Sequence, residues 1–267
     1  ALDRLGPRLD AREHEGCVRR CHGDLHLRNI VLLDGQPRLF DAIEFNDDMA
    51  CIDVLYDLAF LLMDLWHRGL RHHANAVWNG YLSAAGHLDA VALLPLLLSC
   101  RAAIRAKTST TAARLQPDRR AANELARQAE AYLTLARQLL NPPAPCLVAI
   151  GGFSASGKST LARSLAAHIG AAPGAVVIRS DEVRKRLCGV DPLQRLGPEG
   201  YAPEVSRRVY ATIADQARQV AAGGHAVIVD AVCARPADRE AVARAAATAG
   251  VPMVGLWLEA AEPVLIE

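Results

Sequence analysis

Residues 151–160 carry glycines and polar side chains in a pattern that is typical of nucleoside triphosphate binding. The pattern G-x-x-x-x-G-K-[ST] runs from Gly152 to Ser159. Its glycines allow the backbone to curl so that successive N–H groups face the β-phosphate, and the following helix adds the positive end of its dipole. Lys158 is expected to bridge the β- and γ-phosphates, and the Ser159 hydroxyl is expected to bind Mg²⁺. The predicted ATP-binding residues are Gly152, Phe153, Ser154, Ala155, Ser156, Gly157, Lys158, Ser159 and Thr160.

The flanking sequence places this loop between a strand and a helix. The apolar run at residues 146–150 is typical of a buried strand. Beyond the loop, Leu161, Leu165 and Ile169 recur at helical spacing, and Gly170 is expected to end the helix. A plain Gly/Ser turn between a strand and a helix would also account for the glycines. The pattern, the strand and the helix together favour the nucleotide site.

Two carboxylates follow predicted strands in the same half of the chain. The apolar segments 175–179 and 226–229 are predicted strands, and they lead to Asp181 and Asp230. Because ligands bind at the carboxyl ends of parallel strands, both carboxylates are expected near the nucleotide. Burying Asp230 unpaired would be costly, which favours a place beside Mg²⁺ or Lys158. Asp181 could instead only cap the helix that follows it.

A second group of polar residues surrounds a predicted hairpin near the start of the chain. Its strands are expected at residues 30–33 and 38–40. Asp24 and Asn29 precede the hairpin and Asp41 follows it, so the three side chains could meet at one point. Kinase chemistry needs such a group, because one carboxylate orients the attacking hydroxyl while an amide oxygen and a second carboxylate hold Mg²⁺. Each residue taken singly could be a turn or strand-end cap.

The segment from His22 to Asp24, with Asn29 and Asp41, resembles the catalytic loop and metal-binding aspartate of aminoglycoside phosphotransferase-like kinases. The resemblance implies that Asp24 is the catalytic aspartate and that Asn29 and Asp41 are magnesium ligands. It also implies that Asp57, on a following helix, supports the catalytic loop.

Two features depart from the pattern of that family. Arg28 stands where many members carry glycine, and residues 41–45 differ from the Asp-Phe-Gly of protein kinases. Kinases of this type also have an upstream lobe with a lysine for the ATP phosphates. Residues 1–16 are polar, show no clear period and provide no such lobe. We therefore expect that the chain begins inside a longer protein and that this part alone is inactive.

The remaining sequence divides the chain into two domains of an α/β protein. Residues 48–140 are predicted to be helical throughout, because apolar side chains recur at spacings of three and four. Three prolines in residues 141–145 favour an extended connector. We therefore predict a mainly helical kinase C-lobe with a short β-hairpin at 1–140 and a linker at 141–145. A P-loop α/β domain with a mainly parallel sheet is expected at 146–267.

The second domain resembles the P-loop small-molecule kinases, which include gluconate kinase, chloramphenicol phosphotransferase and the 5′-domain of polynucleotide kinase, with zeta toxins more distant. In these families an aspartate in a Ser-Asp-x-x-Arg setting orients or deprotonates the acceptor hydroxyl. The resemblance implies that Asp181 and Arg184 bind the acceptor, and that Asp230 contacts the acceptor or the magnesium water shell. The families also have an arginine-bearing lid after the helix that follows the fourth strand. This chain ends at Glu267 inside that helix, so ATP binding is expected to survive better than turnover.

Composition bounds the kind of partner. Lys and Arg total 30 and Asp and Glu total 29, so a formal net charge of +1 gives no electrostatic case for nucleic acid or an anionic membrane. No apolar stretch approaches the ~20 residues needed to span a bilayer, and no export signal is present, so a cytoplasmic location is expected. The seven cysteines are scattered and odd in number, which argues for reduced thiols.

These observations predict in-line transfer of the ATP γ-phosphate to a hydroxyl of a small molecule. Lys158 and Ser159 are expected at ATP·Mg²⁺ and Asp181 at the acceptor, with Lys158 counted among the catalytic groups. The domain order resembles a bacterial family of fused phosphotransferase and ATP-binding proteins. A non-catalytic ATP-sensing module is one alternative. A polynucleotide 5′-kinase is another, and it depends on the basic residues Arg184, Lys185, Arg186, Arg207 and Arg208.

Overall fold

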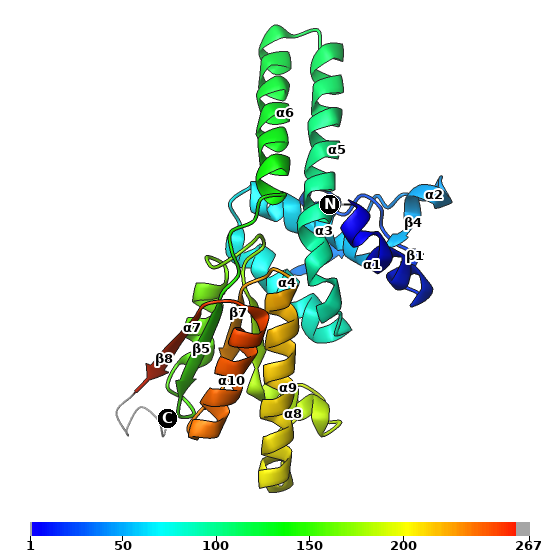
Figure 1. The fold of residues 1–267 in the computed structure, drawn as a ribbon. Helices are drawn as coiled ribbons and strands as arrows, with labels where there is room; N and C mark the ends of the chain where they lie inside the picture. Colours follow the sequence, from blue (N-terminus) through cyan, green and yellow to red (C-terminus); the bar gives the residue numbers. More distant parts are fainter. Residues whose placement is uncertain (1, 260–267) are drawn as a thin grey trace. The chain divides into compact units, whose positions relative to one another are not determined.

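The structure is a computed structural model that describes residues 2–259 (Figure 1). It contains two compact units. The first combines the residues up to 74 with 93–142, and the second combines 75–92 with the chain from 143 onward. Within the described residues, no helix is both long enough and apolar enough to cross a membrane. The helix predicted after the fourth strand lies outside the described residues.

The first unit is mainly helical and carries two small antiparallel sheets. Strand β1 pairs with β4, and β2 pairs with β3. The tight turn between β2 and β3 uses Asp34 and Gly35, both with positive φ, as the predicted hairpin requires. Figure 1 shows α5 and α6 side by side as a long helical hairpin. The elements are α1 (Leu2–His14), β1 (Val18–Arg20), η1 (Leu27–Asn29), β2 (Ile30–Leu33), β3 (Gln36–Leu39), α2 (Asp47–Ala50), β4 (Cys51–Asp53), α3 (Val54–His67), α5 (Leu94–Leu115) and α6 (Arg119–Leu139).

Helix α1 is not anticipated by the sequence, which shows no clear apolar period there. Its buried face includes a charged residue: Arg12 is 1% exposed and forms a two-pronged ion pair with Asp53, at 2.7 Å from Nε and 2.8 Å from Nη2. Asp53 also caps α3 by accepting a hydrogen bond from the backbone N–H of Leu55. An ion pair therefore occupies a position where a periodicity analysis expects an apolar side chain.

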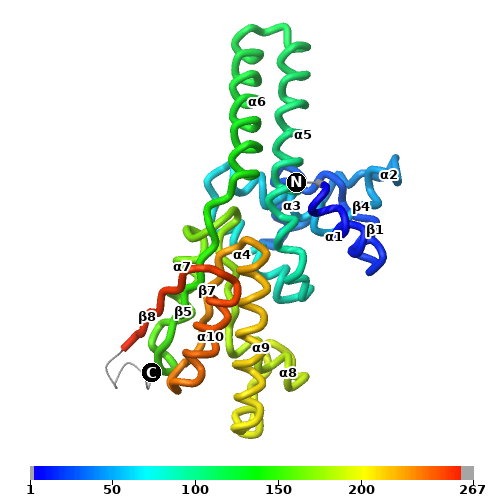
Figure 2. Tube along the Cα trace, viewed as in Figure 1, coloured from blue at the N-terminus to red at the C-terminus, as the bar shows by residue number. Residues whose placement is uncertain are grey.

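The second unit has the predicted parallel sheet. Its strand order in the described residues is β6-β7-β5-β8, and every neighbouring pair is parallel. The trace in Figure 2 follows the alternation of strand and helix through this unit. The elements are α4 (Arg71–Ala85), η2 (Leu88–Leu93), β5 (Leu147–Gly152), α7 (Lys158–Ala166), β6 (Val176–Arg179), α8 (Ser180–Leu187), η3 (Pro198–Tyr201), α9 (Pro203–Ala222), β7 (Val227–Asp230), α10 (Pro236–Ala249) and β8 (Met253–Leu258).

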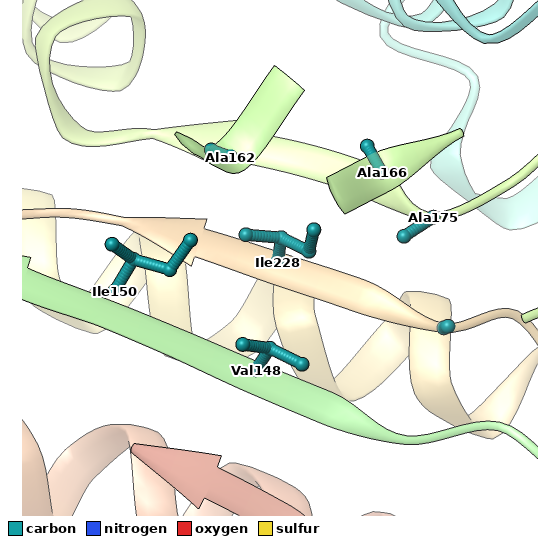
Figure 3. Packing of buried hydrophobic residues seen from close by; sticks show 7 residues of the cluster. Val148, Ile150, Ala162, Ala166, Ala175 and Ile228 are labelled. Atoms are coloured by element: carbon teal, nitrogen blue, oxygen red, sulfur yellow. The ribbon is translucent and has the colours of Figure 1, made fainter. Parts of the chain in front are cut away.

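The core of this unit lies between the sheet and α7. Val148 and Ile150 of β5 and Ile228 of β7 point toward Ala162 and Ala166 of α7 (Figure 3). The alanines let the helix approach the strands closely, which brings the start of α7 to the carboxyl end of β5. The alternate residues of β5 and β7 are buried as well, so both faces of these strands are covered. The apolar runs of the sequence reflect this two-sided burial.

Residues 75–92 belong to the second unit, although the predicted first domain extends from 1 to 140 without a break. Asn79 of α4 accepts a hydrogen bond at 2.7 Å from the backbone N–H of Val177 in β6. The side-chain amides of Asn75 and Asn79 both donate to the carbonyl of Ala175, at 3.0 and 3.2 Å. The domain boundary at 141–145 is compatible with the division between the units at 142 and 143. A contiguous first domain over residues 1–140 is not compatible with that division, because two asparagines bind part of α4 to the edge of the sheet.

Asn79→Leu is expected to loosen this edge. The substitution removes the acceptor of the Val177 N–H, which costs about 1–3 kcal/mol for an unpaired buried group. Hydrogen–deuterium exchange of a peptide covering residues 176–179 should become faster by about 5- to 150-fold if exchange follows local opening. Asn141→Leu is a matched control, because Asn141 is exposed and donates only within its own helix end, to Arg137. Unchanged exchange at 176–179 in Asn79→Leu would contradict the assignment.

Candidate functional site

The loop between β5 and α7 has the conformation that the phosphate-binding pattern predicts. Gly152 has a φ of 139° and Gly157 has a φ of 86°, values that favour glycine. A Cβ placed on Gly152 would lie 2.5 Å from the backbone oxygen of Leu258 and 2.9 Å from Ser156 Oγ. The loop can keep this conformation as a phosphate cradle only with glycine at position 152, because a side chain there would collide with the end of β8 and with Ser156. Ala155 also has a positive φ, of 64°, without being glycine.

Lys158 and Ser159 stand at the start of α7, facing the loop and β7. The Lys158 ammonium donates to the carbonyl oxygen of Phe153 and lies 3.4 Å from Ser156 Oγ. Lys158 is 9% exposed. Burial lowers the pKa of Lys158, and the charge of Asp230 opposes this shift. The Lys158 side chain therefore folds back over the loop, and its ammonium lies where a phosphate would bind.

Ser159 is joined to Asp230, which lies 71 residues later in the chain. Ser159 Oγ donates to Asp230 Oδ2 at 2.6 Å. Asp230 is 4% exposed and ends β7, and the register of the parallel pair places it opposite Ile150 of β5. The structure therefore brings together three residues that the sequence predicts at the nucleotide: Lys158, Ser159 and Asp230.

These groups suit magnesium bound together with a nucleotide. A hydroxyl and a carboxylate are hard oxygen donors, which Mg²⁺ prefers. Among residues 2–259, no group of three or more His, Cys, Asp or Glu side chains is placed to hold a metal ion. Ser159 and Asp230 would therefore hold Mg²⁺ together with phosphate oxygens and water, as Mg²⁺ commonly binds.

A cleft of about 880 Å³ opens beside the loop. Its lining includes Lys158, Ser159 and Asp230 together with Asp181 and Arg184, so the acceptor residues predicted from the sequence border the same space as the nucleotide residues. The volume is in the range of ligand-binding clefts, about 300–1,000 Å³.

Asp181 does not cap a helix in this structure. Helix α8 begins at Ser180, and its N-cap is Arg179, which makes no side-chain capping bond. Asp181 lies in the first turn of α8, its side chain is 48% exposed, and Oδ2 is 3.3 Å from the ammonium of Lys185. The alternative that Asp181 only caps the helix is therefore wrong, and its carboxylate is accessible from the cleft.

Arg184 is largely engaged by the protein itself. It is 8% exposed, and its Nη1 donates to the carbonyl of Gly200 at 2.7 Å and to Ser206 Oγ at 3.2 Å. Its guanidinium also lies 4.9 Å from the ring centre of Tyr201. Arg184 therefore stabilises the part of the cleft lining to which Ser206 belongs. Its predicted contact with the acceptor stays a prediction.

Two further residues of the cleft are missed by the motif analysis. Arg179 ends β6, and its Nε lies 3.4 Å from Asp230 Oδ2. Tyr210 of α9 accepts a hydrogen bond at 2.9 Å from the backbone N–H of Cys233, in the loop after β7. The strand-end rule could have found Arg179, because it directly precedes Ser180 and Asp181. No local pattern could have found Tyr210, which the packing of α9 brings to the cleft.

The predicted catalytic loop of the first unit is tied to α3. Asp57 of α3 accepts hydrogen bonds from the backbone N–H groups of His22, at 3.0 Å, and Gly23, at 2.9 Å. The amide of Asn29 donates to the carbonyl and to Oδ2 of Asp24, at 3.0 and 3.2 Å. Asp57 thus lies where a carboxylate that supports the loop is expected. The structure brings Asp24 and Asn29 into direct contact.

Asp41 follows β3 with a φ of 59°. The residue before it is bound on both sides, because Phe40 N–H donates to the Asn29 carbonyl at 3.1 Å and the His22 ring nitrogen Nε2 is 2.9 Å from the Phe40 carbonyl. The backbone beside Asp41 is therefore fixed close to the Asn29 backbone. The roles of Asp24, Asn29 and Asp41 in catalysis and metal binding stay predictions.

Comparison with known proteins supports the interpretation of the second unit. Residues 147–267 match a family model described as an AAA domain. Over 240 residues the chain is 34% identical to uncharacterized proteins of Mycobacterium tuberculosis and Mycobacterium bovis, which covers 88% of this chain and 46% of each relative. Over 116 residues it is 34% identical to the adenylyl-sulfate kinase of Myxococcus xanthus, which covers 43% of this chain and 58% of that protein.

The chain spans about half the length of the mycobacterial relatives it matches. The matched family and the similarity to a kinase support a P-loop kinase-like domain in the second unit, with a mixed α/β fold and a parallel sheet. They also favour a nucleotide-binding phosphotransferase over a plain Gly/Ser turn.

Gly152→Ala is expected to weaken nucleotide binding by at least about ten-fold, because the added Cβ collides with the backbone oxygen of Leu258 and displaces the loop from its cradle conformation. The dissociation constant of a fluorescent ATP analogue, N-methylanthraniloyl-ATP, measures the effect. Gly255→Ala is the control, because a Cβ on that glycine meets nothing within 4 Å. Circular dichroism of both variants separates loss of binding from loss of folding. Equal affinities in the two variants would contradict the cradle.

Proposed function

We propose that this protein transfers the γ-phosphate of ATP to a hydroxyl group of a small molecule in the cleft of the second unit. The observation that carries the proposal is the 2.6 Å hydrogen bond between Ser159 and Asp230 beside the phosphate loop. This bond joins the hydroxyl and the carboxylate that suit Mg²⁺, and the Lys158 ammonium contacts the same loop. The similarity of 43% of the chain to an adenylyl-sulfate kinase supports a phosphotransferase.

Each group then has a role in an in-line transfer. The backbone N–H groups of the loop and the ammonium of Lys158 bind the β- and γ-phosphates and stabilise the charge that develops between them. Bound Mg²⁺ supplies further charge neutralisation at the same phosphates. Asp181 orients the acceptor hydroxyl and takes its proton as the new bond from oxygen to the γ-phosphorus forms. The bond from the γ-phosphorus to the bridging oxygen breaks, and ADP leaves.

A small acceptor is favoured over a nucleic acid. The basic run of α8 is bound to the protein itself: Lys185 donates to the carbonyl of Pro192 at 2.8 Å, and Arg186 donates to the carbonyl of Ser83 at 2.9 Å. Arg184 is buried as well, so these hydrogen bonds hold the three basic side chains against the protein rather than extended toward a phosphate backbone. A net charge of +1 agrees with this interpretation.

A second active centre is proposed for the first unit. Asp57 holds the backbone of His22 and Gly23, and Asn29 contacts Asp24. This arrangement supports the proposal that the first unit contains the C-lobe of an aminoglycoside phosphotransferase-like kinase with Asp24 as its catalytic aspartate. Asn29 and Asp41 would then hold Mg²⁺.

Two substitutions separate binding from turnover in the second unit. Lys158→Ala is expected to weaken ATP binding by at least about ten-fold, because it removes the charge on the phosphates. Asp181→Asn is expected to leave the dissociation constant of ATP unchanged and to lower acceptor-dependent ADP release by about 10²- to 10⁴-fold. Asp215→Asn, an exposed carboxylate on α9 paired with Arg218, is the control.

The measurement is ADP release by the full-length protein with Mg²⁺ and a pooled panel of small hydroxyl compounds. Loss of release in Lys158→Ala with full release in Asp24→Asn would place the chemistry in the second unit, and the reverse result would place it in the first. ATP binding with no acceptor-dependent release would favour the non-catalytic sensing module for that panel.

A further inference from the structure

A line of polar contacts leads from helix α4 to the proposed metal site. Ser83 Oγ lies 3.1 Å from Glu182 Oε2, and Glu182 Oε1 lies 2.8 Å from Arg179 Nη1. Arg179 Nε in turn lies 3.4 Å from Asp230 Oδ2, the oxygen that accepts the hydrogen bond of Ser159. All five residues belong to the second unit. The line therefore connects a residue of α4 with the phosphate loop.

Arg179 is held more firmly at Glu182 than at Asp230. Its Nη1 makes a full hydrogen bond to Glu182, while its Nε is buried and makes no hydrogen bond within the described residues. The 3.4 Å approach to Asp230 is an ion pair without hydrogen-bond geometry. Side-chain exposure falls from 33% at Glu182 through 29% at Arg179 to 5% at Asp230. Because Asp230 is almost fully buried, water screens its interaction with Arg179 less than it would at the protein surface.

We propose that Arg179 and Glu182 are positioning residues that fix the carboxylate of Asp230 for Mg²⁺·ATP, and that Ser83 of α4 fixes this pair. The proposal rests on the proposed function, because it concerns the same metal site. It adds a means by which α4 influences that site.

The physical reason is competition for one guanidinium. An arginine that is free to use both of its outer nitrogens binds a carboxylate in two places and occupies both oxygens. Glu182 holds Nη1 of Arg179, so the guanidinium cannot turn to bind Asp230 through both outer nitrogens, and its closest approach to that carboxylate is the 3.4 Å contact of Nε. The contacts of Arg179 and Ser159 both involve Oδ2 of Asp230, which leaves Oδ1 for the water shell of the metal.

Helix α4 is well placed to fix the outer end of this line. Ser83 binds α8 twice, because its hydroxyl donates to Glu182 and its carbonyl accepts from Arg186 at 2.9 Å. One turn earlier, Asn79 accepts the hydrogen bond of Val177 in β6, the strand that ends at Arg179. A shift of α4 would therefore move both supports of the arginine.

The test measures how much Mg²⁺ strengthens nucleotide binding. The dissociation constant of N-methylanthraniloyl-ATP for the full-length protein is determined in EDTA and in Mg²⁺, and the ratio gives the Mg²⁺-dependent gain. Arg179→Met and Glu182→Gln should each lower this gain by about ten-fold, because each removes a charge that positions the buried carboxylate of Asp230. Ser83→Ala should lower it by about three-fold. Affinity in EDTA should change by less than about two-fold, because the loop and Lys158 are untouched.

Arg218→Met is the matched control. Arg218 forms the same i,i+3 type of ion pair, with Asp215, on the exposed face of α9, so the gain should stay at its wild-type value. A gain that is unchanged or larger in Arg179→Met would overturn the proposal, because the arginine would then only compete with the metal for Asp230. An equal loss of affinity in EDTA and in Mg²⁺ would also overturn it, since that pattern indicates a general structural defect.

A failure of the proposed function is separable from a failure of this inference. If the wild-type protein binds the nucleotide in neither condition, the proposed function fails. A double-mutant cycle on the unfolding equilibrium then decides the inference without nucleotide. Coupling of at least about five-fold between Glu182→Gln and Asp230→Asn would support the connection. Independent effects of the two substitutions would overturn it.

Discussion

The hydrogen bond between Ser159 and Asp230 is the contact on which the candidate site depends. It joins the first turn of α7 to the end of β7, and thereby the phosphate loop to the sheet. The bond requires that β5 and β7 be neighbours in a register that sets Ile150 opposite Asp230. It also requires that α7 lie close to the strands, which the alanines at 162 and 166 permit. The geometry of the candidate site therefore depends on the same packing of α7 against the sheet that forms the core of this unit.

The sequence predicts the P-loop part of the second unit, from residue 146 onward, because the local signals there agree with one another. Glycine at 152 and 157, the apolar strand before the loop and the period after it all specify the same strand, loop and helix. Buried parallel strands appear as continuous apolar runs, so their ends, and the carboxylates Asp181 and Asp230 that follow them, can be read directly. What cannot be read is the pairing of side chains across the fold. Tyr210 reaches the cleft through tertiary packing alone, and the contacts of Arg179 with Glu182 and Asp230 have no local signal either.

The sequence is less informative where burial is polar. Helix α1 is not predicted from apolar periodicity, because its buried face carries the charged residue Arg12. This arginine forms an ion pair with Asp53, which lies 41 residues away. The division of the chain is missed for a similar reason. The predicted first domain runs through α4 without a break, because an amphipathic pattern shows that a helix is packed but not what it is packed against. Asn75 and Asn79 decide the matter through hydrogen bonds to a strand that lies about 100 residues further on.

The asparagines of α4 have a consequence for association between copies of the protein. In the described sheet β6 is an outer strand, and an outer strand exposes backbone donors and acceptors that can pair with another chain. Asn79 occupies the N–H of Val177, and Asn75 and Asn79 occupy the carbonyl of Ala175, so the amide side chains imitate the neighbour that β6 lacks. A P-loop domain separated at residue 143 would leave that edge bare. Helix α4 thus protects the sheet against edge-to-edge aggregation.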